Sequence, residues 1–221
     1  AAGLAHEINN PLVSIHTFLS LVAEKRNEDD PEFWGDYLQL ASSEVERIRE
    51  LVATMSRLGR ATGDEPQPAP CDLAQIVCGV VRLTEREARA ADVSVETLPS
   101  APVRKVLGVR EQLHQVVLNL TLNAVHACEP GGKVELRIGS EALPGGECAL
   151  IEVSDSGAGI PEEDLERIFD PFFTTKGPDQ GTGLGLMISH RIVADHHGSI
   201  EVASRPGEGS LFRVLLPFGQ G

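Results

Sequence analysis

The sequence predicts an α+β protein of two parts, an N-terminal helical hairpin and a larger α/β sandwich that follows it. Residues 1–60 carry apolar residues at helical spacing, and a Pro- and Gly-rich segment follows them. Beyond that segment, strand-like and helix-like stretches alternate. With 221 residues, the chain is long enough for one large domain or two small ones with a buried core.

The first part is predicted to be two helices joined by a polar turn. Apolar residues recur every three or four positions over 4–22 and again over 34–55. Pro31, in the turn, is well placed to begin the second helix. Two helices with so wide an apolar stripe cannot bury it alone. We therefore expect either a second copy of the chain, forming a dimeric four-helix bundle, or docking onto the rest of this chain.

The segment 59–70 is predicted to be a linker, because it has three prolines, two glycines and no apolar pattern. We expect a helical domain over 1–60, a linker over 61–71 and a second domain over 72–218. The long connection 156–183 inside the second domain is typical of a functional loop. Helices are predicted over about 72–91, 110–128 and 184–196, and strands near 93–98, 104–108, 133–140, 148–155, 199–204 and 210–216.

Charge and composition exclude several classes of function. The formal net charge of −14 argues against general binding to nucleic acid or to an anionic membrane. The four cysteines are scattered, so neither a zinc site nor a disulfide framework is expected, and a reducing compartment is the simpler interpretation. No run of roughly 18 apolar residues and no signal peptide is visible. We therefore expect a cytoplasmic fragment without direct membrane contact, whose parent protein can still be membrane-anchored.

His6 is the first candidate for chemistry. It lies off the apolar stripe and is expected to be exposed, with Glu7 beside it and Asn10 one helical turn later. An exposed neutral imidazole is a competent nucleophile, and a neighbouring carboxylate can orient it and take its proton. An ordinary polar helix face would explain this segment equally well.

Polar and glycine-rich motifs in the second domain suggest a nucleotide. Asn119, Asn123 and His126 share one face of the helix predicted over 110–128, and amide oxygens suit a hard cation such as Mg²⁺. Asp155 ends a predicted strand, and its carboxylate can accept a hydrogen bond from an exocyclic amine such as that of adenine. Three alternating glycines then begin the last predicted helix, where amide N–H groups favour phosphate. Taken singly, a solvated helix face and ordinary turns would explain these motifs.

Three of the seven phenylalanines, Phe169, Phe172 and Phe173, lie close together in the otherwise polar connection. Bulky apolar groups in a loop need a surface to dock on. The cluster therefore indicates either a lid that closes over a ligand or a small satellite core.

Together and in this order, the motifs resemble those of the sensor histidine kinases of two-component signalling. Phe172-Phe173-Thr174-Thr175-Lys176 is similar to the nitrogen-regulation-like branch of that family. The resemblance covers essentially the whole chain and implies an ATP-binding domain of the Bergerat type, shared with gyrases and chaperones. It rests on five boxes: His6-Glu7-x-x-Asn10-Pro11, Asn119-x-x-x-Asn123-Ala124, Asp155-x-Gly157-x-Gly159, Phe169-x-Pro171-Phe172 and Gly181-x-Gly183-x-Gly185.

The resemblance implies ATP and Mg²⁺ as cofactors and a role for each motif. His6 would attack the γ-phosphorus with Glu7 as base and orienter, and the phosphoryl group would pass to an aspartate of a response regulator receiver domain. Asp155 would hold the adenine amine. Asn123 would be the main Mg²⁺ ligand, with Asn119 near the same ion or the triphosphate. The implied nucleotide-binding residues also include His126, Gly157, Gly159, Ile160, Lys176, Gly181, Thr182, Gly183, Leu184, Gly185 and Ser210.

Some features of the chain leave alternatives open. Asn10 stands where relatives position water to dephosphorylate the regulator, so phosphatase activity is a hypothesis. His126 stands where many relatives have Lys or Arg, which predicts weaker or pH-sensitive nucleotide binding. An ATP hydrolase of the same superfamily is disfavoured because Asn119 replaces the Glu that activates water there. A non-catalytic nucleotide-binding scaffold is disfavoured because the motifs are intact.

Overall fold

The computed structural model describes residues 12–13, 15–22, 34, 45, 67–98, 103–144, 146–175 and 183–218. The chain divides into two compact units, Ala1–Asp64 and Glu65–Gly221. Within the described ranges, no helix is both long enough and apolar enough to cross a membrane.

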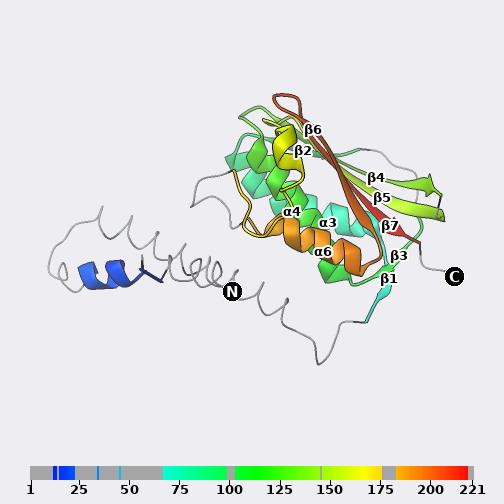
Figure 1. Cartoon of the computed structure of the whole chain (residues 1–221), viewed down its shortest axis with the longest axis horizontal. Coiled ribbons are helices and arrows are strands. Elements are labelled where there is room, and N and C mark those ends of the chain that lie inside the picture. The colour runs from blue at the N-terminus through cyan, green and yellow to red at the C-terminus, as the bar shows by residue number, and fades with distance from the viewer. Residues whose placement is uncertain are drawn as a thin grey trace. The chain divides into compact units, whose positions relative to one another are not determined.

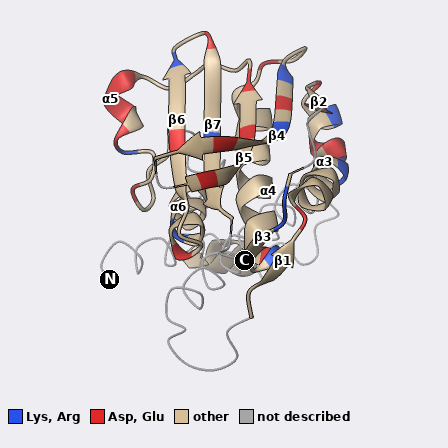
Figure 2. Ribbon diagram, turned by 90° about the vertical axis from the view of Figure 1, so that its right-hand side faces the viewer, with Lys and Arg blue, Asp and Glu red and all other residues tan. Residues whose placement is uncertain are grey.

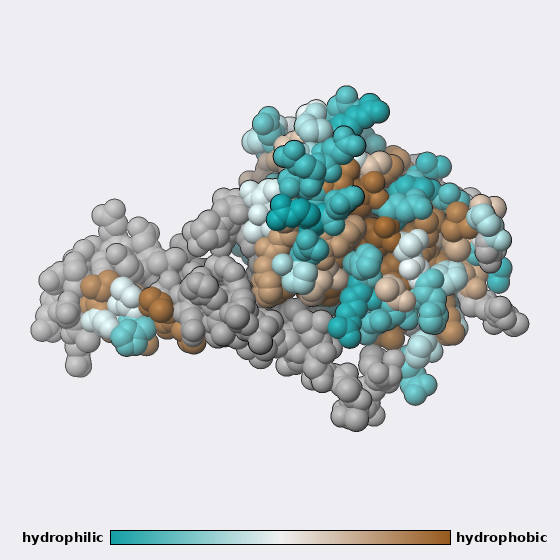
Figure 3. Space-filling model, in the orientation of Figure 1, coloured by the Kyte–Doolittle hydropathy of each residue, from teal (hydrophilic) through white to brown (hydrophobic). Residues whose placement is uncertain are grey.

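In the first unit, every described residue is helical, in agreement with the two helices predicted there. Phe18 is buried. Leu12, Val13 and Leu19 have 48%, 64% and 59% of their surface exposed, and brown side chains are visible on this helix in Figure 3. Leu12 and Leu19 belong to the predicted apolar stripe, so these members of the stripe are uncovered in the single chain.

The second unit is a sheet covered on one face by helices (Figure 1). Its five-stranded sheet has the order β2-β4-β5-β7-β6, in which β2 pairs with β4 in parallel and the other neighbours are antiparallel. A separate two-stranded sheet joins β1 and β3. The elements are β1 (Ala69–Cys71), α3 (Leu73–Ala90), β2 (Ser94–Thr97), β3 (Val106–Gly108), α4 (Arg110–Ala127), β4 (Lys133–Leu143), β5 (Gly146–Asp155), α5 (Glu162–Leu165), α6 (Gly185–Asp195), β6 (Ser199–Arg205) and β7 (Gly209–Pro217).

Local sequence explains why α3 forms and where it begins. Asp72 caps its N-terminus, because one carboxylate oxygen accepts hydrogen bonds from the backbone N–H groups of Ala74 (3.0 Å) and Gln75 (3.3 Å). Apolar residues then recur on one face, where Ile76 and Val80 are fully buried. This face packs on the sheet and on α4, so α3 forms one wall of the core.

The core lies between the sheet and the long helices. Side chains alternate along each strand, so every second residue points toward the helices. Leu136 of β4, Val153 of β5 and Val214 of β7 have no exposed surface. From α4, Val117 and Val125 are equally buried against them. Helix α4 therefore packs against the central strands β4, β5 and β7.

The outer face of the sheet carries a row of alternating charges, visible as coloured bands on neighbouring strands (Figure 2). The strand register places Arg137, Glu152, Arg213 and Glu201 side by side across β4, β5, β7 and β6. Arg213 lies 2.6 Å from Glu201 and 3.4 Å from Glu152, and Arg137 lies 3.6 Å from Glu152. Arg213 also pairs with Glu141. We call Arg137, Glu152, Arg213 and Glu201 the charge row.

Two short elements differ from the predicted organisation. Residues 69–71, predicted as the end of the linker, form strand β1, which pairs with β3. The pairing joins residues 35 to 39 positions apart, so no local pattern indicates it. Helix α5 interrupts the long connection predicted over 156–183, and its first turn carries three acidic residues that suit a helix N-terminus.

Candidate functional site

Asp155 ends the central strand β5, and its carboxylate is half-buried. Its Oδ1 accepts hydrogen bonds from the backbone N–H groups of Gly157 (2.9 Å) and Ser210 (3.2 Å). Burial raises the pKa of the Asp155 carboxyl, and the two backbone hydrogen bonds oppose that rise. Among the described residues, no group donates a hydrogen bond to Oδ2. This oxygen can therefore accept a hydrogen bond from an N–H donor of a ligand.

The loop after Asp155 is held by the turn between β6 and β7. The backbone N–H of Gly207 donates to the carbonyl of Ala158 (2.7 Å), and that of Ile160 donates to Ser204 Oγ (2.8 Å). The Ser204 hydroxyl in turn donates to the carbonyl of Gly209 (2.9 Å). One hydroxyl thus links the loop to the turn, which keeps the loop in place beside Asp155.

The same loop lies directly against the end of α4. A Cβ atom on Gly157 would lie 2.4 Å from the carbonyl oxygen of Ala127, so no side chain fits at this position. The next residue, Ala158, donates its backbone N–H to that carbonyl (3.1 Å). Gly159 packs against the backbone of Arg205 in the β6–β7 turn. The predicted glycines therefore let the loop fit between α4 and the turn.

The two asparagines of α4 differ in their surroundings. Asn119 donates from Nδ2 to the carbonyl of Gly185 (3.2 Å) and to Ser189 Oγ (3.4 Å), both on α6. Because Nδ2 points toward α6, the Oδ1 atom of the same amide points away from Gly185 and Ser189. Asn123 lies one turn later and is half-buried, and its amide makes no hydrogen bond within the described part of the chain. Amide oxygens are suitable ligands for Mg²⁺, so both residues fit such an ion.

The N-terminus of α6 is open to an anion. The helix begins at Gly185, after the buried Leu184. No side chain of the described residues caps it, and its first turn holds no acidic residue. Gly183 precedes it with φ +64°, and a Cβ there would lie 2.4 Å from the backbone carbon of Phe172. Phe172 also donates its backbone N–H to the carbonyl of Gly183 (3.1 Å). Glycine is therefore required at Gly183, and the uncapped N–H groups of α6 can bind phosphate.

The clustered phenylalanines are at least partly docked. The Phe169 ring lies 5.0 Å from that of His190 on α6, and the Arg167 guanidinium lies 4.8 Å from the Phe173 ring. Phe169 and Phe173 both pack against the hydrophobic core. Of the two interpretations, these contacts favour a satellite core for these two residues.

His126 and Asn119 contact different helices, although the spacing predicted a shared face. His126 is exposed, and its Nε2 lies 3.2 Å from Glu87 Oε1 on α3, whereas Asn119 faces α6. His126 therefore contacts α3. The predicted site residues His6, Glu7, Asn10, Lys176, Gly181 and Thr182 lie outside the described residues.

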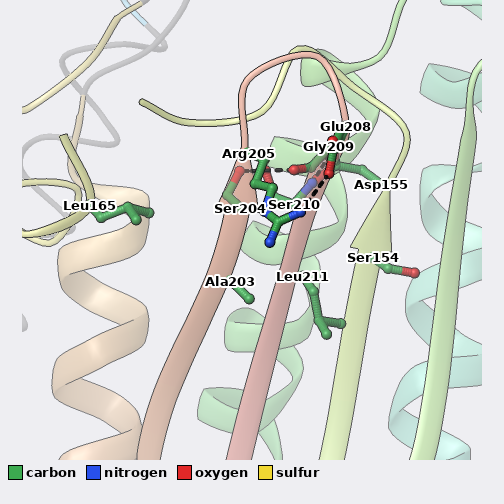
Figure 4. A pocket seen from close by; sticks show the side chains of 10 residues that line it. All are labelled: Ser154, Asp155, Leu165, Ala203, Ser204, Arg205, Glu208, Gly209, Ser210 and Leu211. Atoms are coloured by element: carbon green, nitrogen blue, oxygen red, sulfur yellow. Dashed lines mark hydrogen bonds and ion pairs between the residues drawn. The ribbon is translucent and has the colours of Figure 1, made fainter. Parts of the chain in front are cut away.

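A hollow of about 520 Å³ opens at the ends of β5, β6 and β7 (Figure 4). Ser154, Leu211 and Ala203 line it and are neighbours across these three strands. Because the residues that alternate with them face the helices, these three lie on the outer face of the sheet. Asp155 and Ser210 reach the hollow from the strand ends. The hollow is therefore not the space beside α4 and α6.

Comparison with known proteins identifies the family. Residues 108–220 match the model of the histidine kinase-, DNA gyrase B- and HSP90-like ATPases. The chain belongs to this family. Residues 1–63 match the His Kinase A (phospho-acceptor) domain, and the two domains together are those of a histidine kinase. The predicted helical region followed by an α/β ATP-binding domain is confirmed.

The chain is similar to curated protein kinases of bacteria. The sensor histidine kinase ZraS of Escherichia coli K12 is 35% identical over 98% of this chain, and sporulation kinase A of Bacillus subtilis is 33% identical over 98%. This chain spans 44% and 34% of the lengths of these two proteins.

Solved structures show the same architecture. The histidine kinase ThkA in its complex with the response regulator TrrA has a TM-score of 0.77 and 28% identity, covering 98% of this chain and 60% of that one. The catalytic domain of ThkA alone has a TM-score of 0.59 and 32% identity, covering 68% of this chain and 95% of that one.

Two serines that help build the site are missing from the residues selected by sequence. Ser189 is fully buried on α6 and accepts from Asn119. Ser204 links the loop after Asp155 to the β6–β7 turn, and its Oγ lies 3.0 Å from that of Ser210. The two strands predicted near 199–204 and 210–216 form a hairpin that pairs Ser204 with Ser210, so the short segment between them was an available signal. No comparable signal marked Ser189.

Proposed function

We propose that this chain is the catalytic core of a sensor histidine kinase, which binds Mg-ATP and phosphorylates its own His6. One observation carries the proposal: Asn119 on α4 contacts Gly185 at the uncapped start of α6. This contact brings amide oxygens that suit Mg²⁺ next to N–H groups that suit phosphate. The proposed domains are a phosphoacceptor hairpin over 1–60, a linker over 61–71 and an ATP-binding domain over 72–218.

Each side of the site has a distinct proposed role. Asp155 Oδ2 accepts a hydrogen bond from the adenine amine, because it is the oxygen of a half-buried carboxylate that no described residue donates to. Asn123 and Asn119 would hold Mg²⁺ through their amide oxygens, and the ion would supply positive charge to neutralise the phosphates. The start of α6 binds the phosphates with its amides. The other proposed nucleotide-binding residues are His126, Gly157, Gly159, Ile160, Lys176, Gly181, Thr182, Gly183, Leu184 and Ser210.

The proposed phosphoryl transfer needs few groups, because it depends mainly on alignment and neutralised charge. His6 attacks the γ-phosphorus through a neutral ring nitrogen, and Glu7 orients the ring and takes its proton. The phosphoryl group then passes to an aspartate of a response regulator receiver domain. ThkA resembles 98% of this chain and has been solved with a response regulator, which supports a partner of this class.

A homodimer is part of the proposal. Leu12, Val13 and Leu19 are exposed apolar residues on one described helix, and a second copy of the hairpin would cover them. We assign the chain to the nitrogen-regulation-like branch because of Phe172-Phe173-Thr174-Thr175-Lys176. Because its substrates would be ATP and a response regulator, we place this part of the protein in the cytoplasm.

Autophosphorylation with γ-³²P-ATP and Mg²⁺ tests this function. Wild type is compared with His6→Gln and with His16→Gln, which removes an exposed histidine from the same predicted helix. We expect acid-labile, base-stable label in wild type and His16→Gln, and none in His6→Gln. Label that persists in His6→Gln would refute the assignment of the nucleophile. Release of ADP without labelled protein would favour the ATP hydrolase instead.

Asn10 is proposed to position water for dephosphorylation of the regulator. The variant Asn10→Ala should then phosphorylate itself normally but dephosphorylate the regulator more slowly. Both rates are measured on the same preparation, using separately phosphorylated regulator for the second. An unchanged dephosphorylation rate would remove this activity from the proposal.

A further inference from the structure

We propose that His196 is a positioning residue for the nucleotide site, because its imidazole sets the register of α6 along α4. The proposal rests on the proposed function, since it concerns the same site. His196 itself lies at the opposite end of α6 from the start of the helix. It would act through the two helices and touch no ligand.

The imidazole bridges the end of α6 and the start of α4. Val109, the residue before α4, has an aliphatic side chain that cannot cap the helix. Its backbone N–H donates instead to His196 Nε2 at 3.0 Å. The other ring nitrogen, Nδ1, lies 2.7 Å from the carbonyl oxygen of Ile192, one turn earlier in α6. The ring thus acts as the N-terminal cap of a different helix.

These two contacts determine the protonation of the ring. Because the backbone N–H of Val109 can only donate, Nε2 must hold a lone pair. The single ring proton is then on Nδ1, where it donates to the carbonyl of Ile192. A ring with both nitrogens protonated would place two donors against each other at Val109. The bridge therefore requires neutral His196 in its Nδ1–H form.

The ring is also held from the side by β3. A Cβ atom on Gly108 would lie 2.7 Å from Cδ2 and 2.9 Å from Nε2 of His196, so the ring occupies the place of a side chain there. Gly108 immediately precedes Val109. Any residue larger than glycine would push the ring away from the N–H that it caps.

A second hydrogen bond joins the same two helices near the start of α6, where Asn119 donates to the carbonyl of Gly185 (3.2 Å). Along α4, the residues that make the two hydrogen bonds, Val109 and Asn119, are ten positions apart, which is about 15 Å at the rise of an α-helix. Along α6, His196 and Gly185 are eleven residues apart, or about 16.5 Å. The two hydrogen bonds are therefore almost equally far apart along both antiparallel helices, and together they hold the helices in one register.

This register determines the distance between the two halves of the proposed site. The amide oxygens are on α4, and the phosphate-binding N–H groups are at the start of α6. A slip of one residue would shift one helix along the other by about 1.5 Å. A displacement of about 1 Å can cost on the order of a hundredfold in a catalytic step, and Mg²⁺ demands near-ideal geometry. Loss of the bridge should thus weaken nucleotide binding.

The first test is the binding of Mg-AMP-PNP to the full chain, measured by calorimetry on the folded protein. His196→Ala should bind several-fold to about tenfold more weakly, because the affinity that a fixed register supplies cannot exceed the free energy of the hydrogen bond that fixes it. His196→Gln should recover most of the affinity, because its amide oxygen can accept from Val109. His197→Asn is the control: His197 is the exposed neighbour with φ +58°, a conformation that Asn tolerates.

A purely structural role would lower the melting temperature of His196→Ala but leave the affinity of the folded fraction unchanged, and that result would overturn the proposal. Gly108→Ala gives an independent test, because it displaces the ring without removing it. It should weaken binding as His196→Ala does, and unchanged affinity in this folded variant would equally overturn the proposal.

Nitrogen-15 NMR of the ring supplies a readout that does not depend on nucleotide. Wild-type His196 should show a protonated Nδ1 and an unprotonated Nε2 at neutral pH, and the Nε2–H form would overturn the bridge. If wild type shows the Nδ1–H form but does not bind Mg-AMP-PNP, the proposed function fails and the bridge stands. The two failures are therefore distinguishable.

Discussion

Replacing Asp155 by Asn separates the stability of the fold from the proposed recognition of adenine. The new side-chain amide would keep an Oδ1 acceptor for the N–H groups of Gly157 and Ser210. It would replace Oδ2, which makes no hydrogen bond within the described residues, by an NH₂ group. The substitution therefore removes the charge and reverses the hydrogen-bonding character of the atom proposed to accept from the adenine amine.

The sign of the effect on stability follows from the direction of the pKa shift. Burial raises the pKa of Asp155 in the folded protein above its ordinary value. Its favourable contribution to folding is therefore complete only below the unfolded pKa, and it is lost as pH rises through the folded pKa. At neutral pH the buried charge opposes folding. Asp155→Asn should leave the ligand-free melting temperature unchanged or raise it.

Nucleotide affinity should change in the opposite direction. A hydrogen bond to a charged group contributes about 1.5–3 kcal/mol, so its loss should weaken binding by roughly 10- to 150-fold. Calorimetry with Mg-AMP-PNP measures this loss, and thermal unfolding without ligand measures the stability. Asp195→Asn is the control, because Asp195 is an exposed carboxylate with only a 4.0 Å contact to Arg191.

Either of two results would refute this reasoning. Wild-type affinity in Asp155→Asn would mean that this carboxylate does not bind the adenine amine. A ligand-free melting temperature clearly below that of wild type would mean that the buried charge does not oppose folding.

Three further outcomes are expected. Wild-type affinity for Mg-AMP-PNP should fall on acidification as Asp155 protonates, and the fall should begin above the ordinary aspartate range because the pKa of Asp155 is raised. In the same calorimetric pH series, Asp155→Asn should not show this loss of affinity. Gly183→Ala should cost about 1–3 kcal/mol in urea unfolding, because alanine is strained at φ +64°, and it should also weaken nucleotide binding; unchanged stability would contradict the backbone geometry. Arg213→Met should lower the free energy of unfolding by about 1–3 kcal/mol, since three carboxylates lose their shared partner. Arg89→Met, at an exposed pair, should lower it by at most about 0.5 kcal/mol. Equal losses in the two variants would mean that the charge row stabilises the protein no more than an exposed ion pair does.

Much of the second unit could be predicted because its signals are local. The ends of α3 follow from the cap at Asp72 and from an apolar face that repeats with the helical period. The β6–β7 hairpin follows from two alternating segments around a Pro-Gly turn, which also fixes Ser204 opposite Ser210. In such cases the interaction that determines the structure joins residues close together in the chain.

The unpredicted features depend on contacts between distant segments. Strand β1 exists because residues 69–71 pair with β3, and a three-residue strand has no periodicity of its own to detect. The spacing of Asn119 and Asn123 placed them on one face but did not show that Asn119 would donate to α6. The bridge from His196 to Val109 was likewise hidden, because it depends on where α6 ends relative to α4.

The charge row also has an evolutionary consequence. Each inner member, Glu152 and Arg213, has an oppositely charged neighbour on both sides. Reversing the sign of one inner member would create two like-charge contacts, and cross-strand contacts of that kind are destabilising. Reversing all four signs together would preserve every pairing along the row. Sequences that diverge from this chain should therefore change these positions as a correlated set, either by exchanging signs in concert or by losing the charges together.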